Sequence, residues 1–174
     1  VSDMRDIECS QFVRNLFLAC GISCRTRRRG DTNVRMDGVV HFADGLFGVV
    51  EIETGLAVLD SPRALLEDVA VAHSRFGIPL DRIYPISVIT RFPNERSEYF
   101  QVIDDIHNVL GVRCRTMTIG TLLVLTWNFC QLGNIADIFE TTTNGTNLQP
   151  AIREHVLSTL PKREPYPGAY QPSK

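Results

Sequence analysis

Three carboxylates near the start of the chain are spaced for metal-ion chemistry. Asp37 comes just before one apolar stretch, and Glu51 and Glu53 end the next. Side chains two residues apart in a strand point to the same face, so Glu51 and Glu53 share a face. Mg²⁺ is held by one or two carboxylates and several waters. Such an ion polarises a phosphate and activates water, which is the chemistry of phosphodiester hydrolysis.

Whether Asp37 joins the two glutamates depends on the turn of a β-hairpin that we predict at 39–53. A two-residue turn ending at Gly45 would pair Asp37 with Ile52 and send its side chain to the wrong face. A three-residue loop with Gly45 in the left-handed region pairs Asp37 with Glu51 instead. Glycine stands where the longer loop needs it. Chemistry at these acids therefore requires the second register.

Two glutamates would have supporting roles. Glu53 would position the attacking water by accepting its hydrogen bond, or would hold a second metal. Glu8 lies one turn before Phe12, on the edge of the apolar face of a helix expected at about Asp6–Cys20. A carboxylate there either points into a cleft or interacts favourably with the helix N-terminus.

Arginine supplies almost all of the positive charge. The only lysines are Lys162 and Lys174, and five arginines fall between Arg25 and Arg35. This cluster is either a solvated basic loop or a patch that contacts nucleic-acid phosphates. The expected phosphate contacts are Arg27, Arg28, Arg29 and Arg35.

The remaining pattern predicts alternating helices and strands. We expect strands at Val39–Phe42, Leu46–Glu53, Arg82–Thr90 and Arg113–Ile119. Further helices are expected from Ser61, as cap, to Gly77, and at Ser97–Leu110, Thr121–Leu132 and Ala151–Leu160, with a loop at Thr141–Pro150. This order predicts an α/β fold, a mixed central sheet with helices on both faces. Residues 1–160 would form one domain, and 161–174 a flexible proline-rich tail.

The helix that starts at Ser61 is expected to bury one apolar side. Its inner face would carry Leu65, Leu66, Val69, Ala72, His73 and Phe76. On that face His73 is expected to be a hydrogen-bonded core histidine, with Glu67 and Arg63 as rival polar candidates for a cleft. Trp127 is expected to pack in the core or at an interface.

Composition indicates a soluble intracellular protein, cytoplasmic or nucleoid/nuclear. No apolar run is long enough to cross a bilayer. The five cysteines lack zinc-site spacing and are expected to be small buried thiols. The start at Val1 has neither an initiator Met nor a signal-peptide pattern, so we expect an excised or trimmed domain, which leaves room for a recognition domain before it.

These motifs resemble the PD-(D/E)xK nuclease superfamily. The resemblance rests on Asp37-Gly38 and then Glu51-Ile52-Glu53-Thr54-Gly55, after the helix that bears Glu8, and it covers about residues 6–119. It implies a restriction-endonuclease-like core, ordered α-β-β-β-α-β. It also implies that Glu8, Asp37 and Glu51 bind catalytic Mg²⁺ or Mn²⁺.

Two departures from the family pattern shape the expected function. Met36 replaces the usual proline, and Glu53 stands where the family has lysine, although active E-x-E members exist. The resemblance implies a metal-dependent endonuclease acting on DNA, and a homodimer or a second catalytic domain would be needed to cut both strands. The alternatives are an inactive nuclease-fold module that binds nucleic acid or protein, and an unrelated α/β ligand-binding protein.

Overall fold

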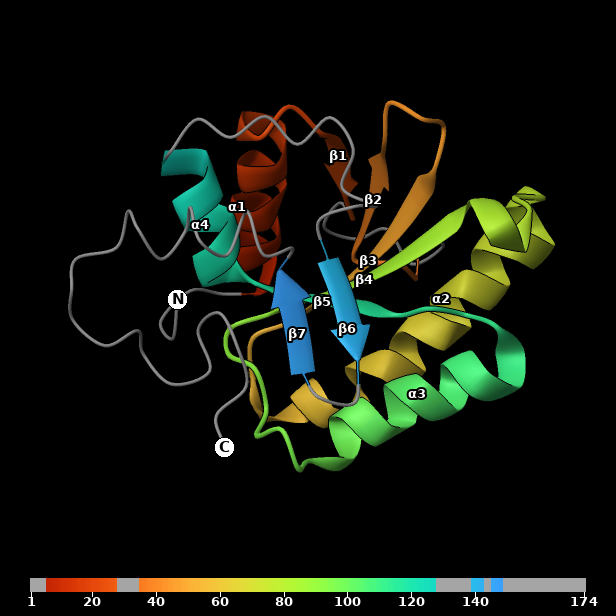
Figure 1. The fold of residues 1–174 in the computed structure, drawn as a ribbon. Helices are drawn as coiled ribbons and strands as arrows, with labels where there is room; N and C mark the ends of the chain where they lie inside the picture. The colour runs from red at the N-terminus through yellow and green to blue at the C-terminus, as the bar shows by residue number, and fades with distance from the viewer. Residues whose placement is uncertain (1–5, 28–34, 128–138, 143–144, 149–174) are drawn as a thin grey trace.

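The fold is built on one five-stranded mixed sheet with helices on both faces (Figure 1). The computed structural model describes residues 6–27, 35–127, 139–142 and 145–148. The sheet order is β1-β2-β3-β4-β5, with strands β1 Ser23–Thr26, β2 Gly38–His41, β3 Phe47–Glu53, β4 Ile83–Ile89 and β5 Arg115–Thr118. The helices are α1 Asp6–Ala19, α2 Ser61–Phe76, α3 Glu98–Leu110 and α4 Ile119–Trp127, with short 3-10 turns at Leu56–Asp60 and Leu80–Arg82. The predicted α/β class and mixed sheet are confirmed.

The two sheet faces carry separate hydrophobic clusters. Val50 packs in the cluster under α1 and α4, whereas Val49 packs in the cluster under α2 and α3. Alternate residues of β3 thus face opposite layers, as strand geometry requires. The expectation that both faces of this hairpin are covered is confirmed.

Two strand regions depart from the sequence-based expectation. The implied α-β-β-β-α-β order includes a strand before the hairpin, but no residues between Gly21 and Val39 were assigned to it; β1 forms there and pairs antiparallel with β2. The loop expected at Thr141–Pro150 is wrong for the described part, because β6 Phe139–Thr142 pairs with β7 Gly145–Leu148. Only two residues separate these strands.

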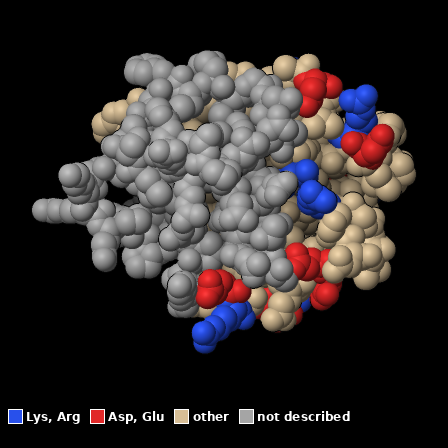
Figure 2. Space-filling view, viewed as in Figure 1, with Lys and Arg blue, Asp and Glu red and all other residues tan. Residues whose placement is uncertain are grey.

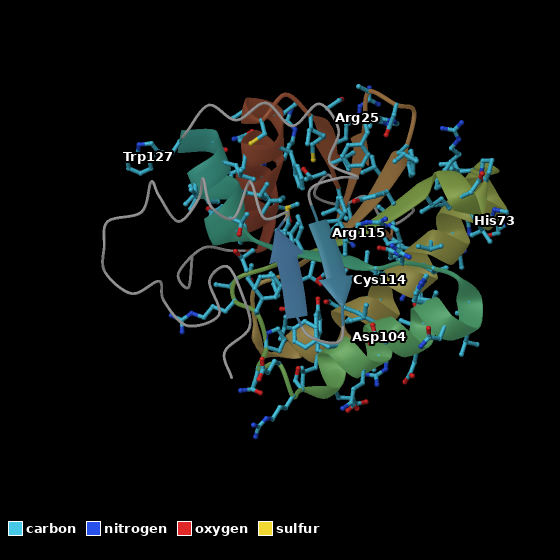
Figure 3. The ribbon with its side chains drawn as sticks, viewed as in Figure 1. Arg25, His73, Asp104, Cys114, Arg115 and Trp127 are labelled. Carbon is cyan, nitrogen blue, oxygen red and sulfur yellow. The ribbon has the colours of Figure 1, made fainter. Side chains whose placement is uncertain are left out.

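Helix α2 begins and ends close to the predicted residues, but its inner face differs. Its N-cap is Asp60, because the Ser61 hydroxyl instead contacts the Ser87 hydroxyl at 2.7 Å. Gly77 ends the helix in the left-handed conformation, as predicted. The placement of His73 and Phe76 on a buried face is wrong. His73 is exposed at the outer side of α2 (Figure 3), and Phe76 is 57% exposed.

The second half of the core follows the sequence more closely. Helix α3 has Ser97 as its N-cap and left-handed Gly111 at its end, as predicted. Pro85 lies inside β4 without interrupting it, since pairing with β5 begins only at Ile86. Trp127, expected to be packed, is 83% exposed and lies at the end of α4 (Figure 3).

Several predictions lie outside the described residues. These are the phosphate-contacting roles of Arg28 and Arg29, the helix at Ala151–Leu160 and the tail at 161–174. Of the five cysteines, the four described ones are buried thiols that form no disulfide, which confirms that expectation for them: Cys9, Cys20, Cys24 and Cys114. Within the described ranges, no helix combines the length and apolar character needed to cross a membrane.

Candidate functional site

The hairpin adopts the register that brings Asp37 and Glu51 together. Gly38 lies opposite Val50, so Asp37, one residue further, comes opposite Glu51. Gly45 has φ +82°, as the three-residue loop requires. The Ile52 N–H donates to Asp37 Oδ2 at 3.1 Å, which fixes the aspartate at the end of β3. The register predicted for chemistry is confirmed.

Glu51 is surrounded by other acids. Burial, together with the nearby carboxylates of Asp37, Asp68 and Glu53, raises the pKa of Glu51 to about 8, although Arg35 opposes the rise. Burial disfavours the ionised form, and like charges add to that cost. The end of β3 is therefore a place where a cation would be stabilised.

Glu53 is held beside the turn that follows β3. Its Oε1 accepts a hydrogen bond from the Gly55 N–H at 2.6 Å. A side chain at Gly55 would crowd that oxygen, since a Cβ built there lies 3.1 Å from it. The turn thus fixes the Glu53 carboxylate on the same strand face as Glu51.

Asp68 of α2 is a site residue that the sequence interpretation missed. Its side chain is 2% exposed, and its Oδ2 has no hydrogen-bond partner within the part of the chain that the structure describes. Burial raises the pKa of Asp68 to about 6, with Asp37 adding to the rise and Arg35 opposing it. A signal existed, because Asp68 lies three residues after Leu65 and four before Ala72, on the buried side of the helix.

The arginines predicted to contact phosphate are placed differently from one another. Arg35 forms an ion pair with Glu67, and its Nε lies 4.0 Å from Asp68 Oδ1. Arg27 is exposed, and its backbone N–H donates to the Asp37 carbonyl at 3.0 Å. On the face seen in Figure 2, basic and acidic side chains are interspersed over the described surface. Of the predicted phosphate contacts that are described, Arg35 lies against the acids.

Glu8 belongs to a different layer. It is half-buried on α1, whose neighbouring residues Cys9 and Val13 pack in the same cluster as Val50. Glu51 points to the other face, towards α2. The structure therefore brings Asp37, Glu51, Glu53 and Asp68 together, and it puts Glu8 on the helix layer that covers the opposite face. The rival candidate Arg63 is exposed and pairs with Asp60 and Glu98.

Hydrogen bonds between buried hydroxyl groups connect α2 and α3 to the sheet next to the acidic cluster. Ser87, which lies opposite Glu51 across the β3–β4 pair, contacts Ser61 at 2.7 Å. Tyr99 of α3 is fully buried, and its hydroxyl contacts the Thr116 hydroxyl of β5 at 2.7 Å. These polar groups are satisfied within the protein, so they stabilise the scaffold that places Glu51.

We expect Tyr99→Phe to destabilise the protein by about 1–2 kcal/mol, because the buried hydrogen bond between the Tyr99 and Thr116 hydroxyls would be lost. Urea unfolding would measure this loss. The matched control is the double variant with Thr116→Val, which removes both polar groups. The double variant should lose less free energy of unfolding than the two single variants lose in sum. Additive losses would show that the two hydroxyls are not coupled.

Oxygen ligands of this kind suit Mg²⁺ or Mn²⁺. In the described part of the chain, no group of three histidine, cysteine or acidic side chains is arranged to hold a metal ion. Two carboxylates with waters are enough for Mg²⁺, and Asp37 and Glu51 supply them. Asp68 Oδ2, which makes no hydrogen bond to another described residue, is a further oxygen ligand at the same cluster. The donor set therefore fits a hard divalent cation.

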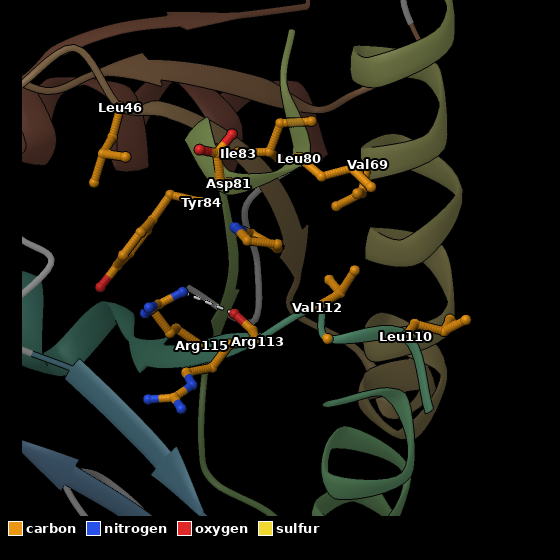
Figure 4. A pocket seen from close by; sticks show the side chains of 12 residues that line it. Leu46, Val69, Leu80, Asp81, Ile83, Tyr84, Leu110, Val112, Arg113 and Arg115 are labelled. Atoms are coloured by element: carbon orange, nitrogen blue, oxygen red, sulfur yellow. Dashed lines mark hydrogen bonds between the residues drawn. The ribbon is translucent and has the colours of Figure 1, made fainter. Parts of the chain in front are cut away.

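A separate cavity of about 380 Å³ lies at the opposite end of the strands (Figure 4). Its lining includes Tyr84 and Val112 and also Arg113 and Arg115. The Arg115 guanidinium stacks 3.6 Å from the centre of the Tyr84 ring, and its Nη1 donates to the Arg113 carbonyl at 2.8 Å. None of the four clustered acids lines this cavity, so it is a different feature from the acidic site.

Comparisons of this chain with protein-family models, with curated proteins and with solved structures find no match.

Proposed function

We propose that the protein is a metal-dependent endonuclease that hydrolyses phosphodiester bonds of DNA. The observation that carries the proposal is the hairpin register, which places Asp37 opposite Glu51. The order of α1, β1, β2, β3, α2 and β4 also supports a restriction-endonuclease-like core, because it is the order that the family resemblance implies. Asp37 and Glu51 are the proposed metal ligands, in a cluster whose electrostatics favour a cation.

Each acid has a proposed task. Bound Mg²⁺ or Mn²⁺ would supply polarisation of the phosphate and a lower pKa for water. Asp37, fixed by the Ile52 N–H, would present its carboxylate next to Glu51. Glu53, held by the Gly55 N–H, would accept the hydrogen bond of the attacking water and orient it. Glu8 enters this scheme only if α1 contributes to the site from the opposite layer.

Cleavage of supercoiled plasmid tests the proposal. The wild type should nick plasmid with Mg²⁺ or Mn²⁺ and not with EDTA. Asp37→Asn keeps an acceptor for the Ile52 N–H but removes the charge, so nicking should fall about a hundredfold or more, the scale of losing one preorganised electrostatic group. Asp105→Asn is the charge-matched control, because Asp105 is exposed on α3, and it should cut like the wild type.

The second candidate is a non-catalytic module that binds nucleic acid or protein. Two observations favour it: Arg35 lies against the acidic cluster, and the described residues contain no three-ligand metal group. A wild type that binds DNA, melts cooperatively and leaves plasmid uncut with either metal would establish this candidate. Metal-dependent nicking that Asp37→Asn abolishes would exclude it.

A further inference from the structure

Asp68 is energetically unfavourable as a purely structural residue. It lies on the sheet-facing side of α2, where Leu65, Val69 and Ala72 are buried apolar neighbours in the helix. Its side chain is 2% exposed, and among the described residues Oδ2 has no hydrogen-bond partner. A buried carboxylate without compensating contacts destabilises a fold by several kcal/mol. A residue with this cost calls for a positively charged partner.

Arg35 is a positively charged neighbour of Asp68, but its contact with that carboxylate is incomplete. Its Nε is 4.0 Å from Asp68 Oδ1, which is beyond hydrogen-bond distance. Its Nη2 pairs with Glu67, which is exposed on the next position of α2. The Arg35 side chain is itself 59% exposed, so it can leave the cluster for solvent. The Arg35 guanidinium is therefore held at the edge of the acidic cluster by Glu67, and its Nε is too far from Asp68 for a hydrogen bond.

The electrostatic coupling extends from Asp68 to both acids of the hairpin. Asp37 acts on Asp68, and both act on Glu51, while Arg35 opposes the effect at Asp68 and Glu51. The three carboxylates therefore share one region of negative potential. One guanidinium neutralises one of their charges, whereas a divalent ion neutralises two. The cluster favours the divalent ion once Arg35 moves aside.

The carboxylates of Asp37, Glu51 and Asp68 form no metal-binding group in the arrangement described here, in which Arg35 lies against Asp68. We propose that Asp68 becomes a cation ligand together with Asp37 and Glu51 when a bound divalent ion displaces the Arg35 guanidinium, which is a tethered counter-cation. This inference rests on the metal site of the proposed function and adds a third ligand and a built-in competitor to it. Arg35 sets the threshold for metal binding, because the ion must replace its contact with Asp68. Sequence spacing alone gave neither role.

Titration of the purified protein with Mn²⁺ alone, followed by calorimetry without nucleic acid, tests the inference. Asp68→Asn should weaken Mn²⁺ binding by about tenfold or more, at least the effect of losing a residue that supports a metal ligand. Arg35→Gln should strengthen binding severalfold, because the competitor is gone. Asp105→Asn should bind Mn²⁺ like the wild type. Thermal melting in EDTA checks folding, and Asp68→Asn should melt no lower than the wild type, since it removes a buried charge.

The outcomes separate this inference from the proposed function. Mn²⁺ binding that Asp37→Asn weakens and Asp68→Asn leaves unchanged would overturn the ligand role of Asp68 and keep the hairpin site. Weaker binding in Arg35→Gln would overturn the competitor role. Absence of binding in both the wild type and Arg35→Gln would overturn the inference and the metal site together. Mn²⁺ binding that depends on Asp68, in a protein that does not nick plasmid, would support the inference and would exclude only the proposed nuclease activity.

Discussion

Replacing Glu51 with glutamine is expected to stabilise the protein at alkaline pH and to leave its stability near pH 4 almost unchanged. The folded state raises the pKa of Glu51 from 4.5 to about 8. Below pH 4.5 the Glu51 side chain is protonated in both the folded and the unfolded state, so it does not lower the free energy of unfolding. Between the two values the unfolded chain releases the proton while the folded protein keeps it, so stability falls as pH rises. The full penalty is reached above about pH 8.

The expected gain above pH 8 is about 2 kcal/mol, less than the pKa change alone implies, because solvent screens this half-buried carboxyl. Urea unfolding in EDTA from pH 4 to pH 9 would measure the difference between Glu51→Gln and the wild type. Asp68 titrates in both proteins, so the difference reports mainly Glu51. Glu98→Gln is a control, since Glu98 is exposed and pairs with Arg63. A difference that is flat with pH would contradict the burial of Glu51 among acids.

Gly48→Ala is expected to destabilise the protein by about 3 kcal/mol, the upper end of ordinary overpacking. Gly48 is buried in β3 opposite Val40, and an added Cβ would collide with Val40 Cγ2 and lie 3.1 Å from Phe42 Cε2. Val40 is fully buried, so its side chain cannot turn into solvent to avoid the added Cβ. The strands would have to separate at the hairpin that sets the acid register.

Gly120→Ala is the matched control for Gly48→Ala. Gly120 lies in α4, and a Cβ there meets its nearest neighbour, Thr118 Oγ1, at an ordinary 3.7 Å. Alanine should stabilise the helix by about 0.5–1 kcal/mol because it restricts the unfolded chain. Urea unfolding of both variants should therefore shift in opposite directions. A Gly48→Ala protein as stable as the wild type would show that β2 and β3 are not packed as closely as described.

The sequence contained enough local information to predict the hairpin, whereas its register followed from the requirement that the acids act together. Strand parity puts Glu51 and Glu53 on one face, and Gly45 allows the loop that adds Asp37. Both rules act over a few residues, so they do not depend on the rest of the fold. The capped ends of α3 were predictable for the same reason.

The missing parts depended on tertiary contacts. Asp68 follows the buried spacing of α2, but a charged residue is normally assigned to the solvent side, and only the neighbouring acids give it another meaning. Periodicity shows the direction of a side chain and not whether another element reaches it, which is why Phe76 is exposed. Arg35 looked like part of a basic patch, and its ion pair with Glu67 is visible only after α2 packs on the sheet.

The four clustered acids all come from one unbroken part of the chain, from the start of β2 through α2. This continuity governs how such a site can diverge over evolutionary time. Insertions or deletions after β4 can remodel the far side of the domain and leave the spacing of the acids intact. A one-residue slip between β2 and β3 would instead turn Asp37 to the opposite face while preserving every acid in the sequence. Descendants could therefore lose the site without losing its residues.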